Sequence, residues 1–268
     1  MLGFGRLFKH EFSAVGRVML PLYGAVIASS IIFGLSNLIG ADNGGGILTV
    51  TTALLYGLTV MAVIAFTAVI LIQRYYKNLL GNEGYLNFTM PVSINAHIGN
   101  KTLSAGLWMF FAAVVGMLSV FIIMQFMVTP AEIAQEAGAI WDEISAATPS
   151  AAAKLALLII EVLAIMIVGG SEIAIKIYAA ISLGQLWSNH RVLGAVGAYI
   201  GLSIAESILG GVMEQIIPLS GPSSLMNGLS DFAQSQVMML VILAVQLAMI
   251  AIYWVVNNRL LTKKLNLQ

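Results

Sequence analysis

The chain has 268 residues, of which 59% are hydrophobic and only 9% charged, and its formal net charge is zero. Soluble domains carry a charge on roughly a quarter of their residues, so this composition excludes a soluble protein and indicates an integral membrane protein. The zero net charge argues against nucleic-acid binding, and a chain without cysteine has no disulfides or thiolate sites.

The first 18 residues have the pattern of an amphipathic helix. Apolar and basic side chains fall on opposite faces, so we expect residues 1–18 to form an interfacial helix along the cytoplasmic membrane surface, against membrane lipid. Glu11 breaks the pattern, because it projects from the apolar face. Since an unpaired charge there would be costly, we expect Glu11 to find a basic or hydrogen-bonding partner on a neighbouring helix.

Six apolar runs follow, each near the roughly 20 residues that a hydrocarbon layer about 30 Å thick requires. They cover residues 19–39, 47–73, 102–128, 155–187, 192–217 and 237–257. The fourth run could be divided at Gly169 and Gly170, but two spans and a turn do not fit into its 33 residues. We therefore predict a single all-α transmembrane domain with six transmembrane helices.

Lysine and arginine lie almost entirely on one side of these spans. That side holds Arg6, Lys9, Arg17, Arg74, Lys77, Lys101, Arg191, Arg259, Lys263 and Lys264, against Lys154 alone on the other. Loops rich in lysine and arginine stay in the cytoplasm. We therefore expect a multi-pass protein of the plasma membrane with both termini, including the basic tail of residues 258–268, in the cytoplasm.

An outer connection, residues 129–153, carries a helix-start pattern. Thr129 can serve as N-cap, Pro130 as the first helical residue and Glu132 as the closing member of a capping box. This predicts a short amphipathic outer helix. It is either a connector resting on the bilayer or a lid over a substrate exit, and the sequence leaves both open.

The longest cytoplasmic connection, residues 74–101, joins the second and third spans. Gly81 and Gly84 should end the helix that leaves the membrane, and Pro91 prevents a continuous helix through the segment. Several aromatic and aliphatic side chains lie between these residues with no obvious place to be buried. Such an elbow is the kind of surface that a partner protein covers, although it could pack against its own chain.

Polar side chains inside the spans are few, and each needs a reason. They include Gln125, Glu161, Glu172, Lys176, Glu206 and Gln246. Glu172 and Lys176 stand four residues apart in the favourable acid-first order, so we expect them to neutralise each other along their helix. These residues could line a proton or substrate pathway, or they could join helices; both readings remain open.

Signs of catalysis are missing from the sequence. The phosphate-binding pattern G-x-x-x-x-G-K-[ST] does not occur, so we do not expect the chain to bind ATP in that manner by itself. The spans contain no visible nucleophile and base pair and no metal-ligand set. We expect a protein that is not itself an enzyme and holds no cofactor or metal of its own.

Four segments resemble a group of type-2 ABC transporter permeases from Gram-positive bacteria. They are LFKHEFSAVGRVMLPLYGA, YKNLLGNEGYLNFTMPVS, IYAAISLGQLWSNHRVLGA and NNRLLTKKLNLQ. The resemblance implies six spans, an interfacial N-terminal helix and a coupling helix in the first cytoplasmic loop that docks on a separate ABC ATPase subunit, which would bind ATP and Mg. The residues that would take the docking role here are Asn82, Glu83, Gly84, Tyr85, Leu86, Asn87, Phe88, Thr89, Met90 and Pro91.

The same resemblance implies an exporter whose path is formed by two permease chains, identical or related. Small residues on the fifth span would let helices approach closely in such an assembly, and they are Gly194, Ala195, Gly197, Ala198 and Gly201. Two other classes stay open. One is a proton-coupled secondary transporter using Glu161, Glu172 and Lys176 with Glu206, and the other is an intramembrane enzyme or a membrane scaffold.

Overall fold

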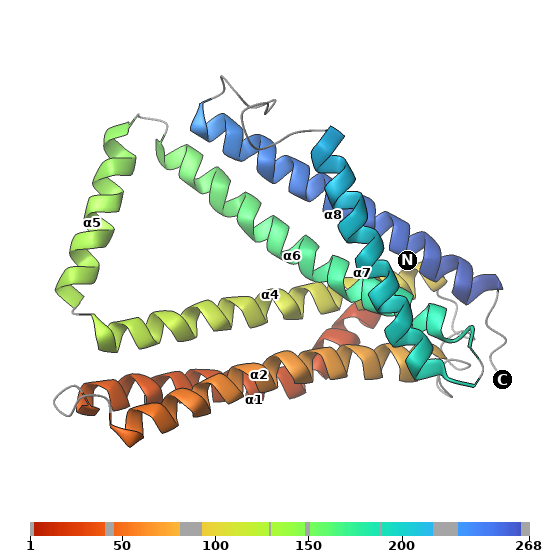
Figure 1. The fold of residues 1–268 in the computed structure, drawn as a ribbon, viewed down its shortest axis with the longest axis horizontal. Helices are drawn as coiled ribbons and strands as arrows, with labels where there is room; N and C mark the ends of the chain where they lie inside the picture. The colour runs from red at the N-terminus through yellow and green to blue at the C-terminus, as the bar shows by residue number, and fades with distance from the viewer. Residues whose placement is uncertain are drawn as a thin grey trace. The chain divides into compact units, whose positions relative to one another are not determined.

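The computed structural model describes residues 3–40, 46–80, 93–128, 130–147, 151–187, 189–216 and 230–263. The elements in this part of the chain are all helices (Figure 1). In chain order they are α1 (Gly3–Gly40), α2 (Ile47–Tyr75), the π-helical turn η2 (Tyr76–Leu80), α4 (Ile94–Met127), α5 (Pro130–Ala147), α6 (Ala151–Gly184), α7 (Arg191–Ile216) and α8 (Asp231–Lys263).

Six of these helices, α1, α2, α4, α6, α7 and α8, are long and apolar enough to cross a membrane. They coincide with the six predicted spans, so the expectation of an all-α, multi-pass membrane protein is confirmed at this level. Helix α6 continues through Gly169 and Gly170, which confirms one fourth span and not two. Many large apolar side chains on the helix surfaces are exposed, such as Ile47 and Val192, as lipid-facing residues should be.

The predicted change from interfacial helix to first span, at residues 18 and 19, does not appear as a break. Helix α1 runs unbroken for 38 residues and includes Pro21. A proline inside a helix removes one backbone hydrogen bond, a loss that membrane helices tolerate where neighbouring groups compensate. A location along the membrane surface for the first part of α1 stays a prediction.

The segment with the helix-start pattern does form a helix. Helix α5 begins at Pro130 and has Glu132 in its first turn, while Thr129 lies outside the described residues. The predicted docking residues, 82–91, also lie outside them. Their role as a coupling elbow therefore stays a prediction.

The chain divides into two compact units. Unit 1 comprises Met1–Glu11, Leu71–Leu107 and Glu161–Gln268, and unit 2 comprises Phe12–Ile70 and Trp108–Ile160. Helices α1, α2, α4 and α6 each contribute one part to each unit, whereas α5 lies in unit 2 and α7 and α8 lie in unit 1.

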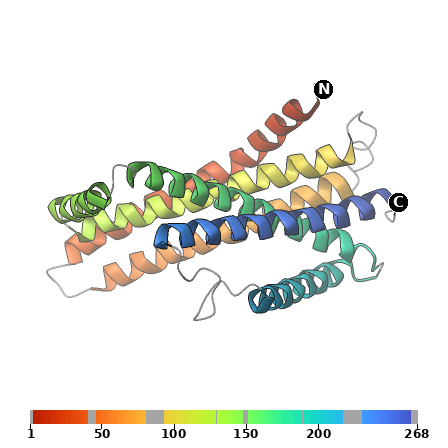
Figure 2. The ribbon, with the colours of Figure 1, turned by 90° about the horizontal axis from the view of Figure 1, so that it is seen from above.

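The core of unit 2 is formed by parts of α1, α2 and α4 that lie side by side (Figure 2). Its core contains Val15, Met19, Tyr23, Val26, Val63 and Trp108. Trp108 stacks on Phe12 with ring centroids 4.7 Å apart, and its backbone carbonyl accepts a hydrogen bond of 2.7 Å from the Tyr23 hydroxyl. Aromatic packing therefore holds the middle of this unit together.

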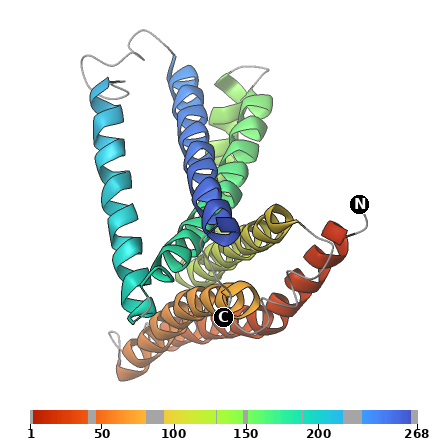
Figure 3. The same cartoon turned by 90° about the vertical axis from the view of Figure 1, so that its right-hand side faces the viewer.

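Unit 1 brings α4, α6 and α8 together around Ile98, Ile175, Ala179, Tyr253 and Leu261. Figure 3 shows α8, in blue, beside α6. Helices α6 and α7 come very close at Gly184, where an added Cβ would lie 2.5 Å from the backbone nitrogen of Ala195. Gly194 takes part in the same contact, whereas Gly197 and Gly201 face open space.

Candidate functional site: polar clusters within unit 1

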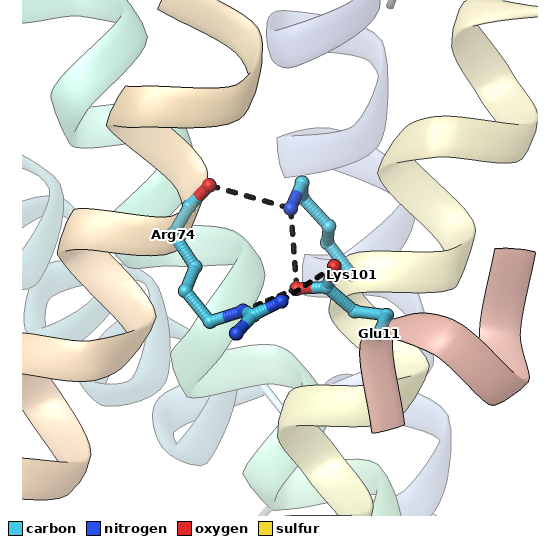
Figure 4. Close-up of polar contacts among 3 residues, drawn as sticks. All are labelled: Glu11, Arg74 and Lys101. Atoms are coloured by element: carbon cyan, nitrogen blue, oxygen red, sulfur yellow. Dashed lines mark hydrogen bonds and ion pairs between the residues drawn. The ribbon is translucent and has the colours of Figure 1, made fainter. Parts of the chain in front are cut away.

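Glu11 lies at the centre of the first cluster (Figure 4). Arg74 donates from Nε to Oε1 of Glu11 at 2.9 Å and from Nη2 to Oε2 at 3.3 Å, a two-pronged contact. The Lys101 ammonium donates to the same Oε1 at 3.2 Å. One carboxylate from α1 thus binds one cation from α2 and one from α4. We call these three residues the Glu11 cluster.

The Glu11 cluster is largely shielded from solvent. The side chains of Lys101 and Glu11 are 6% and 12% exposed, and that of Arg74 is 28% exposed. Burial weakens screening by water, so these contacts are stronger than those of a surface ion pair. The expectation that Glu11 has a basic partner on a neighbouring helix is confirmed, with two partners and not one.

The two cations lie on either side of the predicted coupling elbow. Arg74 is in the last turn of α2, where its backbone carbonyl accepts a hydrogen bond of 3.3 Å from Lys101 Nζ. Lys101 lies near the start of α4. The helix that enters the connection and the helix that leaves it are therefore held by one carboxylate and by each other.

A second cluster begins at the neighbouring residue, Tyr75, whose side chain is completely buried. Its hydroxyl lies 2.9 Å from Ser182 Oγ and 3.0 Å from Asn257 Oδ1, and Ser182 Oγ lies 3.0 Å from the same Oδ1. The Tyr75 ring stacks on Tyr178 with centroids 4.2 Å apart. This Tyr75 cluster ties α2 to α6 and α8.

Asn257 uses its whole side-chain amide in the Tyr75 cluster. Besides the two contacts at Oδ1, its Nδ2 donates to the backbone carbonyls of Ile175 at 3.2 Å and Tyr253 at 3.0 Å. An asparagine side chain has two donor hydrogens and one oxygen with two lone pairs. Its hydrogen-bonding capacity is therefore filled within the bundle.

A third cluster joins α6, α7 and α8. Lys176 on α6 forms an ion pair with Oε2 of Glu206 on α7, and the Tyr253 hydroxyl on α8 donates to Oε1 of the same carboxylate. The Lys176 ammonium also lies 5.1 Å from the ring centroid of Tyr199, a cation–π contact. We call these four residues the Lys176 cluster.

The predicted neutralisation of Glu172 by Lys176 along α6 is met only in part, because the ammonium forms its close ion pair with Glu206 while its charge still attracts the Glu172 carboxylate. A pair on one exposed helix is worth only a few tenths of a kcal/mol. An ion pair between two helices also neutralises the charged residue of the second helix, here Glu206, which would otherwise lie unpaired in an apolar environment.

Most of the predicted intramembrane polar residues lie in unit 1. Glu161 accepts a hydrogen bond of 2.9 Å from Gln236 Nε2 on α8. The Gln246 amide packs over Gly169, where an added Cβ would lie 2.8 Å from Nε2. Gln125 lies in unit 2 and is half-buried. The structure therefore joins Lys176 directly to Glu206 and does not join Glu161 or Gln246 to them.

Sequence reasoning missed several members of these clusters. Tyr253 and Asn257 stand four residues apart on the last span and so share a helix face, which is a signal that could have been read. Arg74 and Lys101 were expected only on the cytoplasmic side of the spans, and neither was expected to bind Glu11. Ser182 gave no signal, because a serine in an apolar helix usually bonds its own backbone.

Searches against protein-family models, curated proteins and solved structures find no match to this chain.

Proposed function

We propose that this chain is the membrane-spanning permease subunit of an ATP-binding-cassette exporter, located in the plasma membrane with both termini in the cytoplasm. The Glu11 cluster is the observation that carries the proposal. It fastens both ends of the connection between α2 and α4 to the start of α1. The four segments that resemble type-2 ABC permeases, and the six apolar helices, support the same function.

The energy source in this proposal is a separate subunit. An ABC ATPase carrying ATP and Mg docks on residues 82–91, and two permease chains, identical or related, form the path between them. The permease supplies no nucleotide-binding residues. Its own task is to convert movement at the docking segment into movement of the helices.

The Glu11 cluster gives a physical route for that conversion. A force on residues 82–91 reaches Arg74 at the end of α2 and Lys101 near the start of α4. Because both cations bind Glu11, the start of α1 moves with them. Charged hydrogen bonds shielded from water resist separation, so three helix ends respond together instead of one by one.

The test of this function is co-purification. The full chain, purified with its native neighbours, should bring an ATP-binding subunit with it. Replacing Tyr85, Leu86 and Phe88 together with alanine should abolish that association, while replacing Glu136 with glutamine on α5 should leave it intact. The proposal fails if no ATPase accompanies the wild-type chain, or if the triple variant retains it as fully as the wild type does.

A second candidate, a proton-coupled secondary transporter using Glu161, Glu172 and Lys176, draws on the Lys176 cluster. An ion pair between α6 and α7 inside the spans is the kind of element that protonation can open. Transport that continues without ATP and collapses in Glu172→Gln would favour this candidate over the exporter.

A further inference from the structure

Helix α5 is tied at both ends to helices that can cross a membrane. Residues 128–129 join it to α4, and residues 148–150 join it to α6. An extended chain covers at most about 3.5 Å per residue, so each end of α5 stays within roughly 15 Å of the helix it adjoins. The end of α4, α5 and residues 151–160 of α6 all belong to unit 2.

The length of α4 indicates the level at which α5 begins. Lys101 is the charged residue that precedes the apolar run of α4, and Met127, at the end of that run, stands 26 residues farther along. At about 1.5 Å per residue this distance is roughly 39 Å, compared with about 30 Å for the hydrocarbon layer and 40–45 Å for a bilayer with its headgroups. A helix whose charge marks one hydrocarbon boundary therefore ends in the opposite headgroup region.

Helix α5 runs crosswise to α4 and does not continue it. Figure 1 shows α5 passing across the end of α4, and Figure 2 shows α5 nearly end-on while α4 lies lengthwise. Since α4 is a helix that crosses the membrane, a helix crosswise to its end lies along the membrane surface.

The two faces of α5 differ in chemistry. Ile133, Ala137 and Trp141 follow one another at steps of four residues and so share one face. Gln135 and Asp142 stand seven residues apart and share the opposite face. The sequence of α5 contains no lysine or arginine, so attraction to anionic headgroups contributes nothing to its position. Contact of the apolar face with lipid has to supply the binding.

The described residues of this chain leave the apolar face of α5 largely open. Trp141 is 56% exposed, Ala137 is exposed and Ile133 is half-buried. The adjoining helices also present apolar side chains outward, such as Met127 of α4 and Ile160 of α6. Tryptophan is enriched at the boundary between lipid and water, where its ring meets hydrocarbon and its N–H meets water.

We propose that α5 lies in the headgroup layer of the leaflet opposite Lys101, which is the outer leaflet in the predicted orientation, with its apolar face on the phospholipid acyl chains. Lipid is the occupant because α4 ends at that level, because the short connections hold α5 there, and because lipid also covers the adjoining spans. The acidic side chains then face water. Of the two roles that the sequence left open for this helix, the proposal selects the connector on the bilayer and sets aside the lid.

The experiment places single labels on the two faces of α5. The chain has no cysteine, so one can be introduced without removing others. The matched pair is Ala137→Cys and Gln135→Cys, both at exposed positions, each labelled with a nitroxide in the full chain in phosphatidylcholine nanodiscs. Power saturation in electron paramagnetic resonance compares collisions with oxygen, which concentrates in hydrocarbon, and with a nickel chelate, which stays in water. We expect the ratio of oxygen to nickel collisions to be several-fold higher at residue 137 than at residue 135.

Trp141 allows a second measurement that needs no label. Trp141→Phe leaves the other three tryptophans in place, so the difference in emission between wild type and variant reports on Trp141. Phosphatidylcholine brominated near the carbonyl end of its acyl chains should quench this difference emission strongly, and iodide in the water should quench it little.

The proposal is overturned if the two labels give the same ratio of collisions, because α5 would then be surrounded by water on both faces. It is also overturned if neither oxygen nor nickel reaches the label at residue 137, because protein would then cover the apolar face as it would under a lid. Quenching of Trp141 by iodide and not by brominated lipid would overturn it as well. These results do not involve an ATPase, so the position of α5 and the exporter function can fail separately.

Discussion

The two units of the chain hold their helices together with different chemistry. In the core of unit 2 that the structure describes, α1, α2 and α4 meet through aromatic and aliphatic contacts and through uncharged hydroxyl pairs such as Ser36 with Thr52 and Tyr56 with Ser119. In unit 1 they include the ion pairs of Glu11 with Arg74 and Lys101, and of Lys176 with Glu206.

The difference indicates where in the chain charged side chains are buried despite the free-energy cost of removing them from water. Hydroxyl pairs and ring stacking join membrane helices without moving a full charge out of water. A buried ion pair has to recover a large desolvation penalty and often adds little net stability. The buried ion pairs of unit 1 are therefore better explained by a function than by stability.

The largest expected effect is that of Glu11→Gln. It leaves Arg74 and Lys101 shielded from water without their carboxylate, and removing one partner of a buried pair costs about 3 kcal/mol. The measurement is the free energy of unfolding in mixed micelles. Glu136→Gln, at an exposed position of α5, should change it by less than about 0.5 kcal/mol. Equal values for the two variants would mean that charge does not hold unit 1 together.

The second-largest effects are expected from replacing glycines at close contacts between helices. These contacts differ between the two units. A Cβ at Gly184 in unit 1 would meet the backbone of Ala195 at 2.5 Å, whereas a Cβ at Gly34 in unit 2 would meet the Phe126 ring at 2.2 Å. The Phe126 side chain can move by rotation about its Cα–Cβ bond and the backbone of Ala195 cannot, so we expect Gly184→Ala to cost about 2 kcal/mol and Gly34→Ala about 1 kcal/mol. Thermal unfolding of the two variants measures this.

The matched control for these glycine variants is Gly197→Ala. No atom lies within 4 Å of a Cβ at this position, so the change should be neutral or slightly stabilising through lower chain entropy. A loss as large as that of Gly184→Ala would show that contacts at residue 184 are not the cause of the effect.

The smallest expected effects on the free energy of unfolding come from removing single tyrosine hydroxyls. Tyr75→Phe takes a donor from Asn257 and a neighbour from Ser182 at a fully buried position, which should cost about 1.5 kcal/mol. Tyr56→Phe in unit 2 should cost about 0.5 kcal/mol, because Ser119 Oγ keeps its bond of 2.7 Å to the Gly116 carbonyl. Chemical denaturation of both variants would reveal the order, and a larger loss for Tyr56→Phe would contradict it.

The sequence predicted the six spans because apolar length is a local property that needs no knowledge of neighbours. It also predicted that Glu11 would have a partner, since a carboxylate on an apolar helix face is conspicuous. It did not identify the partner of Lys176. That choice depends on the rotation of α6 against α7, and the close contact of Gly184 with Ala195 helps to set this rotation. Short-range spacing, which favoured Glu172, contains no such information.

The hydrogen bonds of the Asn257 amide restrict the movement of α8 against its neighbours. Sliding of α8 by one turn against α2 and α6 would break three hydrogen bonds at once, at a residue that is completely buried, while the fourth bond of the amide lies within α8. Sliding of α8 by whole helical turns is therefore disfavoured near Asn257. The parts of α2, α6 and α8 joined there should rotate together as one rigid group. Helix α7 takes no part in the Tyr75 cluster, and its movement against α6 and α8 is expected to depend on the Lys176 cluster instead.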